Sequence, residues 1–187
     1  MTDSAQYTDE MVMFRRSFHS HPETGWTEFR TTSVIVNRLK ELGLTVLQGT
    51  RVINPDFVMG RYPDEVEAGK TRALSEGVSQ ADIDATEGYT GAVAVFDTGR
   101  PGPVSAFRFD IDALYVPETT DPSHLPNKLG FASRHPGLMH ACGHDCHTAE
   151  GLALAHWLVD HKSDLCGTIK LLFQPAEEGT RGALAMS

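Results

Sequence analysis

The chain has 187 residues, of which 40% are hydrophobic and 22% are charged, a composition typical of one globular domain and not of a disordered segment. Sixteen Lys and Arg against 25 Asp and Glu give a net charge of −9. This balance argues against a nucleic-acid-binding protein, because phosphates are bound mainly by Lys and Arg. No apolar stretch approaches the length of about 18 residues that a membrane span needs. The N-terminus is acidic where a signal peptide needs a basic region, so we expect a soluble, cytoplasmic protein.

The N-terminal part predicts two helices followed by a strand. Apolar residues recur on one side of residues 8–20, and Pro22 ends that pattern. Residues 26–42 form a second amphipathic pattern, which stops at Gly43, the usual residue of a helix C-cap. Residues 45–52 continue as a strand candidate.

Residues 61–88 differ from the segments on either side. They are polar and charged and contain few aromatic residues. We expect a polar helical insertion or a mobile loop here, within a single partial catalytic domain over residues 1–187.

The second half of the chain predicts further strands and one long helix. The apolar runs 91–97 and 103–111, with Gly and Pro between them, predict neighbouring strands in a hairpin. Residues 147–161 predict a helix, and residues 167–175 a buried strand. The fold class is therefore α/β, a layered mixed sheet with flanking helices, in which strands separated by a helix pair in parallel.

The segment MHACGHDCHT contains the strongest chemical signal. Cys142 and His144 are separated only by Gly143, and a thiolate and an imidazole are ligands that zinc favours. Two other interpretations remain open. Cys142 could be a small buried hydrophobe with His144 at a helix cap, or the two could form a cysteine–histidine nucleophile pair.

Two pairs of acidic residues follow predicted strands. Glu177 and Glu178 are adjacent, so one could coordinate a cation while the other takes a proton from water. Alternatively, they form a solvated pair at a helix start. Asp110 and Asp112 point to one face of a strand end, where they could meet a cation or only cap the strand.

Taken together, these side chains predict a metal site built from separate loops at the carboxyl ends of strands. Six ligand-capable side chains could serve two ions: Asp110, Asp112, Cys142, His144, Glu177 and Glu178.

Other candidates carry weaker signals. We expect a structural use for His19 and His21, and a core or incidental place for Cys146 and Cys166. Two histidines could orient ligands by hydrogen bonds, namely His140 and His147. Arg181 is a candidate for binding a substrate carboxylate by its position alone.

Four segments occur in the order and approximate spacing of one family: FHSHPETGWTEFRT, FRFDIDAL, HPGLMHACGHDCHT and GTIKLLFQPAEEG. They resemble the M20 metallopeptidase/amidohydrolase family, and within it the aminoacylase-like subgroup with hippurate and auxin-conjugate hydrolases. The resemblance implies the N-terminal portion of a catalytic domain. The lid or dimerisation domain and the further histidine ligands of the family are not matched.

The resemblance also implies roles for particular residues. Cys142, His144 and Glu178 would be metal ligands, and Glu177 would be the general base. Asp112 would support catalysis, while Asp110 stands where the wider family has a histidine ligand. Two divalent ions, zinc or manganese, are implied for the full-length family, whose members are expected to be oligomeric.

The implied activity is hydrolysis of the amide bond of a small-molecule N-acyl amino acid. The insertion at 61–88 is similar to that of one branch of the aminobenzoyl-glutamate utilization proteins, which points to p-aminobenzoyl-glutamate as substrate. Two alternatives stay open: a truncated, catalytically inactive metal-binding homologue, and a thiol-based protein using Cys142 and Cys146. We expect the isolated 187 residues not to turn over substrate.

Overall fold

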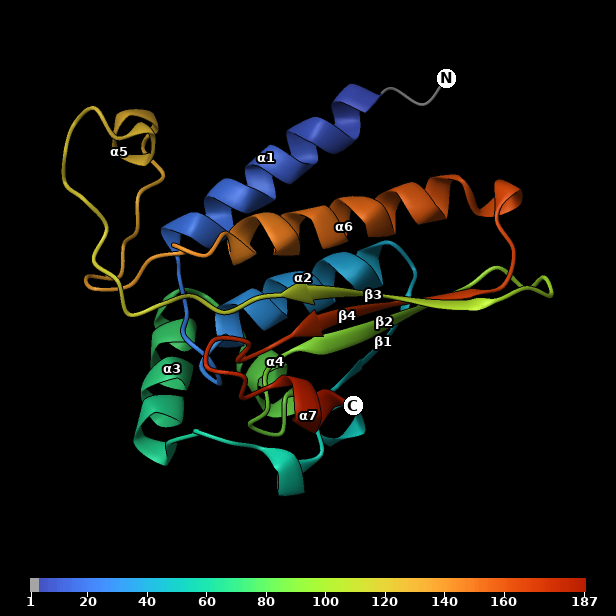
Figure 1. Cartoon of the computed structure of the whole chain (residues 1–187), viewed down its shortest axis with the longest axis horizontal. Coiled ribbons are helices and arrows are strands. Elements are labelled where there is room, and N and C mark those ends of the chain that lie inside the picture. Colours follow the sequence, from blue (N-terminus) through green and yellow to red (C-terminus); the bar gives the residue numbers. More distant parts are fainter. Residues whose placement is uncertain (1–3) are drawn as a thin grey trace.

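A computed structural model describes residues 4–187 as a four-stranded sheet with helices packed against it (Figure 1). The helices and strands are α1 (Ser4–Ser20), α2 (Phe29–Glu41), β1 (Thr45–Gln48), α3 (Pro63–Ser75), α4 (Gln80–Ala85), β2 (Ala92–Asp97), β3 (Val104–Asp110), α5 (Leu125–Leu129), α6 (His144–Asp160), β4 (Thr168–Gln174) and α7 (Ala183–Met186). Within the described residues, no helix combines the length and apolarity needed to cross a membrane.

The sheet is mixed, with strand order β1-β2-β4-β3. β2 runs antiparallel to both β1 and β4, whereas β3 runs parallel to β4, with Asp110 opposite Gln174. The parallel pair is joined through α6, as expected for strands with a helix between them. The α/β class and the layered mixed sheet are confirmed.

The predicted hairpin between β2 and β3 is wrong, because β4 lies between these two strands. The connecting loop wraps around the start of β4: the amide of Thr98 donates to the carbonyl of Gly167 at 3.2 Å, and the amide of Thr168 donates to the carbonyl of Pro103 at 3.0 Å. Gly167 has a φ of +79° and approaches Pro103 too closely for any side chain. The Gly- and Pro-rich loop between β2 and β3 therefore leaves room for β4 between these two strands and binds the start of β4.

Three helices share one core with the sheet: α2 and α6 pack against the strands, and α1 packs against α6. Phe18 of α1, Ile35 of α2 and Leu152 of α6 are fully buried against Leu171 and Phe173 of β4. The predicted N-terminal helices are confirmed, with α1 beginning earlier and α2 later than the patterns indicated.

The structure gives the secondary structure of residues 61–88 and moves two predicted boundaries, the end of β1 and the start of α6. Residues 61–88 contain α3 and α4, so this segment is helical, and its interpretation as an insertion into a catalytic domain stays a prediction. The strand predicted at 45–52 ends at Gln48 and passes into a 3-10 turn. The helix predicted from residue 147 begins at His144, because Gly143 adopts a left-handed conformation with φ +85° and starts a new helix there.

The carboxyl ends of β3 and β4 and the N-terminus of α6 meet at the same end of the sheet (Figure 1). Asp110 ends β3, Gln174 ends β4 and His144 begins α6. The acidic pairs and the Cys142–His144 segment are therefore brought to one place, as expected for an open α/β sheet.

Two neighbouring leucines of β4 test this packing. Leu171 is fully buried in the core, whereas Leu172 points to the opposite face and is only half-buried. We expect Leu171→Ala to lower the free energy of unfolding by about 2–5 kcal/mol, and Leu172→Ala to lower it by much less. Urea denaturation measures both, and equal losses would contradict this assignment of faces.

Candidate metal centre

Three side chains from separate segments converge beside the end of the sheet. Cys142 lies in the loop before α6, His144 is the first residue of α6, and Glu178 follows β4. One possible ligand atom from each lies within 4.8 Å of the other two. The residues that the sequence predicted as ligands are thus close enough to share one ion.

His144 is held in an orientation that suits a ligand. Its Nδ1 lies 2.9 Å from the backbone carbonyl oxygen of Asp112 and 3.3 Å from Asp112 Oδ1. A proton on Nδ1 satisfies these acceptors and leaves Nε2 available for an ion. Burial alone would lower the pKa of His144, but its hydrogen bond to Asp112 and the charge of that residue raise the pKa to about 9.

Asp112 orients the acidic pair. Its carboxylate is buried and accepts two backbone hydrogen bonds, from the amide of Glu177 to Oδ1 and from the amide of Glu178 to Oδ2, both at 3.1 Å. Both carboxylate oxygens are therefore used to hold the turn after β4. The catalytic role predicted for Asp112 stays a prediction, and the contacts seen here are positioning contacts.

The carboxylate of Glu178 and the thiol of Cys142 are both in environments that a bound cation would stabilise. The Oε1 atom of Glu178 is buried and has no hydrogen-bond partner within residues 4–187. Hydrogen bonding to Glu178, burial and the nearby charges of Glu177 and Asp112 raise the pKa of the Cys142 thiol. A buried carboxylate oxygen without a partner is costly, and a cation between Cys142 and Glu178 would relieve that cost.

Glu177 lies beside the candidate ion-binding group and is partly exposed. Its side chain is 33% exposed, and its Oε2 lies 3.7 Å from Nε2 of His144. It is adjacent to the cluster of possible ligands without belonging to it.

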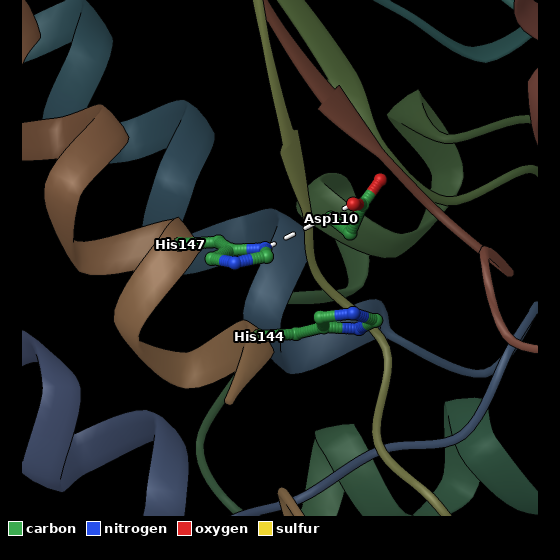
Figure 2. Close-up of side chains that lie close together, drawn as sticks. All are labelled: Asp110, His144 and His147. Carbon is green, nitrogen blue, oxygen red and sulfur yellow. Dashed lines mark ion pairs between the residues drawn. The ribbon is translucent and has the colours of Figure 1, made fainter. Parts of the chain in front are cut away.

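A second group of possible ligands shares His144. His144 and His147 project from the first two turns of α6 toward Asp110 at the end of β3 (Figure 2). His147 Nδ1 lies 3.8 Å from Asp110 Oδ2. However, Arg108 Nε lies 3.1 Å from Oδ1, the other oxygen of Asp110, so a cation compensates this carboxylate even though Oδ1 accepts no hydrogen bond among the described residues. The group of Cys142, His144 and Glu178 is the better metal site.

The donor set of that group fits a divalent metal ion. A thiolate, an imidazole and a carboxylate are the ligand types of zinc sites, and carboxylates also suit manganese. The buried, unpartnered Oε1 of Glu178 supports the same assignment.

The histidines outside the site have different environments. His19 bonds to Asp145 at 2.8 Å and to Glu118 at 3.0 Å, which confirms a structural use. His21 likewise bonds to a backbone carbonyl of α1. The predicted hydrogen-bonding role of His140 is wrong: neither ring nitrogen has a partner within the described residues, and burial lowers the pKa of His140 to about 4.

The structure also gives the environments of Cys146, Cys166 and Arg181. Of the core or incidental place expected for Cys146 and Cys166, the structure excludes the core, since both are exposed. Arg181 donates to the backbone carbonyls of Glu178 and Gly60, each at 3.0 Å, and thus ties the acidic turn to the segment before α3. Its predicted contact with a substrate carboxylate stays untested.

Sequence reasoning missed two residues near the site. Arg108 compensates Asp110, and Glu28 at the start of α2 accepts a hydrogen bond from the amide of Ala176 at 2.9 Å. The alternation of β3 could have paired Arg108 with Asp110, since residues two apart share a face of a strand. No sequence signal joins Glu28 to a turn that lies so far along the chain.

Comparisons with known proteins agree with this architecture. Residues 106–187 match the model of peptidase family M20/M25/M40. The chain is 53% identical over 176 residues to a p-aminobenzoyl-glutamate hydrolase subunit of Escherichia coli, covering 92% of this chain and 40% of the relative. It is 50% identical over 184 residues to indole-3-acetyl-aspartic acid hydrolase of Enterobacter agglomerans, covering 97% and 42%.

Solved structures show the same fold. An aminobenzoyl-glutamate utilization protein from Klebsiella pneumoniae matches with a TM-score of 0.78 at 42% identity, covering 97% of this chain and 40% of that one. A Bacillus subtilis protein described as a dinuclear metal-binding peptidase from the M20 family matches with a TM-score of 0.68 at 33% identity, covering 98% and 39%.

The chain therefore spans about two fifths of the length of these relatives, which it resembles over nearly all of its own length. The family match, the fold and the identities agree with one another. The chain is thus similar to proteins of peptidase family M20/M25/M40, and its residues 106–187 match the model of that family.

Proposed function

We propose that this site binds a divalent metal ion and serves the hydrolysis of the amide bond in an N-acyl amino acid. The observation that carries the proposal is the convergence of a thiol, an imidazole and a carboxylate from three segments, with a second carboxylate beside them.

Each residue has a distinct task in this proposal. Cys142, His144 and Glu178 hold the ion, which when bound polarises a carbonyl and lowers the pKa of water. Glu177 accepts a proton from the attacking water and passes it to the leaving nitrogen as the carbon–nitrogen bond breaks. Its partial exposure beside the buried His144 suits a group that must meet both water and substrate.

We propose p-aminobenzoyl-glutamate as the substrate, with p-aminobenzoate and glutamate as products. The E. coli relative is named for this compound, and the Enterobacter relative for an indole-acetyl aspartate. Both names describe an acyl group on an acidic amino acid. Because the net charge of −9 repels such substrates at long range, a cation near the site must bind the carboxylates.

The number and identity of the ions are part of the same proposal. A dinuclear centre is described for the B. subtilis structure, and we propose two ions, zinc or manganese, for the complete site. Within residues 4–187, only one group of three donors lacks a compensating cation, since Asp110 is paired with Arg108. A metal-binding chain without turnover is therefore the second candidate function.

The other alternative from the sequence is weaker. A thiol-based mechanism needs a thiolate at neutral pH, whereas the pKa of the Cys142 thiol is raised. We also propose a cytoplasmic protein that works in an oligomer. Three free cysteines fit a reducing compartment, and the name of the E. coli relative describes one component of a larger hydrolase.

Cys142 and Cys146 form a matched pair for testing the metal ligand, since both are exposed cysteines of one short segment. We expect the chain, prepared without added metal, to retain a divalent ion in stoichiometric amount by elemental analysis. Cys142→Ser should lose the ion, because serine is a poor ligand for zinc, and Cys146→Ser should retain it. Equal retention by both variants would contradict the site.

Ion binding should depend on pH. His144, with a pKa of about 9 in the metal-free chain, and Cys142, with a raised pKa, must both lose protons to bind the ion. Affinity for zinc should therefore rise between pH 6 and 9, by about tenfold per pH unit for each proton displaced. Calorimetry in buffers of different ionisation enthalpy counts the released protons, and a pH-independent affinity would contradict this ligand set.

Turnover separates the two candidate functions. We expect the zinc-loaded chain to release p-aminobenzoate from p-aminobenzoyl-glutamate far more slowly than the E. coli relative, because residues 4–187 offer only one group of three uncompensated donors for the two proposed ions. Any residual release should fall at least about a hundredfold in Glu177→Gln and persist in Glu150→Gln, which alters an exposed glutamate of α6. A rate close to that of the relative, or activity that survives Glu177→Gln, would contradict the assignment.

A further inference from the structure

Three consecutive backbone amides after β4 donate to carboxylates. The amide of Ala176 donates to Glu28 at 2.9 Å, and the amides of Glu177 and Glu178 donate to Asp112, both at 3.1 Å. This short turn carries both the proposed base and one proposed ligand. Its position is therefore set by two acidic side chains from distant parts of the sequence.

Glu28 joins three elements at this point. It stands at the N-terminus of α2, and its side chain is completely buried. One oxygen accepts from Ala176 after β4, and the other accepts from the hydroxyl of Thr90 before β2 at 2.5 Å. Among the described residues, both oxygens of Glu28 are thus engaged by neighbouring segments.

The backbone that Glu28 holds is in an uncommon conformation. Ala176 has a φ of +50°, in the left-handed region that a residue with a Cβ rarely adopts. Such a conformation persists where surrounding contacts fix it. The hydrogen bond from Ala176 to Glu28 is a contact of this kind, immediately before Glu177.

The charge state of Glu28 fits a role as a hydrogen-bonding group. Burial, and the negative charge of nearby Asp112, raise the pKa of Glu28 to about 8. A carboxyl group accepts the Ala176 amide at one oxygen in either protonation state, so the bond does not depend on the charge of Glu28. The carboxylate of Asp112 in turn contacts His144.

We propose that Glu28 is a positioning residue of the metal centre. By holding the backbone at Ala176, it sets Glu178 within reach of Cys142 and His144, and Glu177 beside them. The inference rests on the proposed function, since the placement of this turn matters for metal binding only if these residues hold an ion.

Glu23 provides a matched control. It is a second completely buried glutamate in the same segment, but it accepts from the amides of Arg30 and Thr31 at the start of α2 and pairs with Arg72 of α3. Among its side-chain contacts within the described residues, none reaches the turn after β4. A change at Glu23 therefore tests the fold around α2 without removing a hydrogen bond from the site.

The experiment uses the full 187-residue chain with Co²⁺ alone as the probe. A cobalt ion bound by Cys142 gives a thiolate-to-metal charge-transfer absorption, so affinity and ligand geometry are read without measuring activity. Circular dichroism confirms that each variant is folded. Glu28→Gln keeps an acceptor for the Ala176 amide, whereas Glu28→Leu removes it. Glu28→Asp is too short to reach both Ala176 and Thr90. Glu23→Gln is the control.

We expect Glu28→Leu and Glu28→Asp to bind cobalt about 10- to 100-fold more weakly, as is typical when a group that orients a ligand is removed. Glu28→Gln should bind within about threefold of the unaltered chain. Glu23→Gln should lower the stability of the fold while leaving the affinity and absorption of the folded protein unchanged.

Several results would overturn the inference alone. One is unchanged cobalt affinity and absorption in folded Glu28→Leu and Glu28→Asp. Another is a loss of cobalt affinity in Glu28→Gln or in Glu23→Gln as large as that in Glu28→Leu. A third is failure of both Glu28→Leu and Glu28→Asp to fold. A missing thiolate absorption in the unaltered chain is a different outcome. It would overturn the proposed metal centre itself, and this inference with it.

Discussion

The carboxylate of Asp112 is the contact on which the arrangement of the site depends. It accepts the amides of Glu177 and Glu178 and lies beside Nδ1 of His144. One buried anion therefore fixes the acidic turn after β4 relative to the start of α6. Because this anion is buried, each bond that it accepts is charge-assisted and strong, and losing one would leave a costly unpaired group.

The fold explains why this contact can form. β3 and β4 run parallel, so the residues that follow both strands emerge at the same end of the sheet. α6 connects these strands and begins at that end, which brings Cys142 and His144 to the two acidic segments. The candidate metal centre is a consequence of one β–α–β unit (Figure 1), and α1 and α2 complete the hydrophobic core beside α6.

Much of this could be predicted from the sequence because the responsible patterns are local. The apolar spacing of residues 26–42 predicts α2. Cys142 and His144 are only two residues apart, so the sequence alone indicates that both could bind the same ion. The order of the strands could not be predicted in this way. Sequence neighbours β2 and β3 look like a hairpin until β4, from much later in the chain, takes the place between them. The role of Glu28 was missed for the same reason, since its bond to Ala176 joins segments far apart in the sequence, whereas the pairing of Arg108 with Asp110 follows from strand alternation.

The proposed chemistry depends on Cys142, His144 and Glu178 binding one shared ion. X-ray absorption spectroscopy of the zinc-loaded chain can establish whether they do, because it resolves the atoms that surround the metal. We expect one sulfur at about 2.3 Å together with nitrogen and oxygen neighbours at about 2.0–2.2 Å. A spectrum without sulfur in the coordination shell, or with sulfur that remains in Cys142→Ser, would refute the shared site.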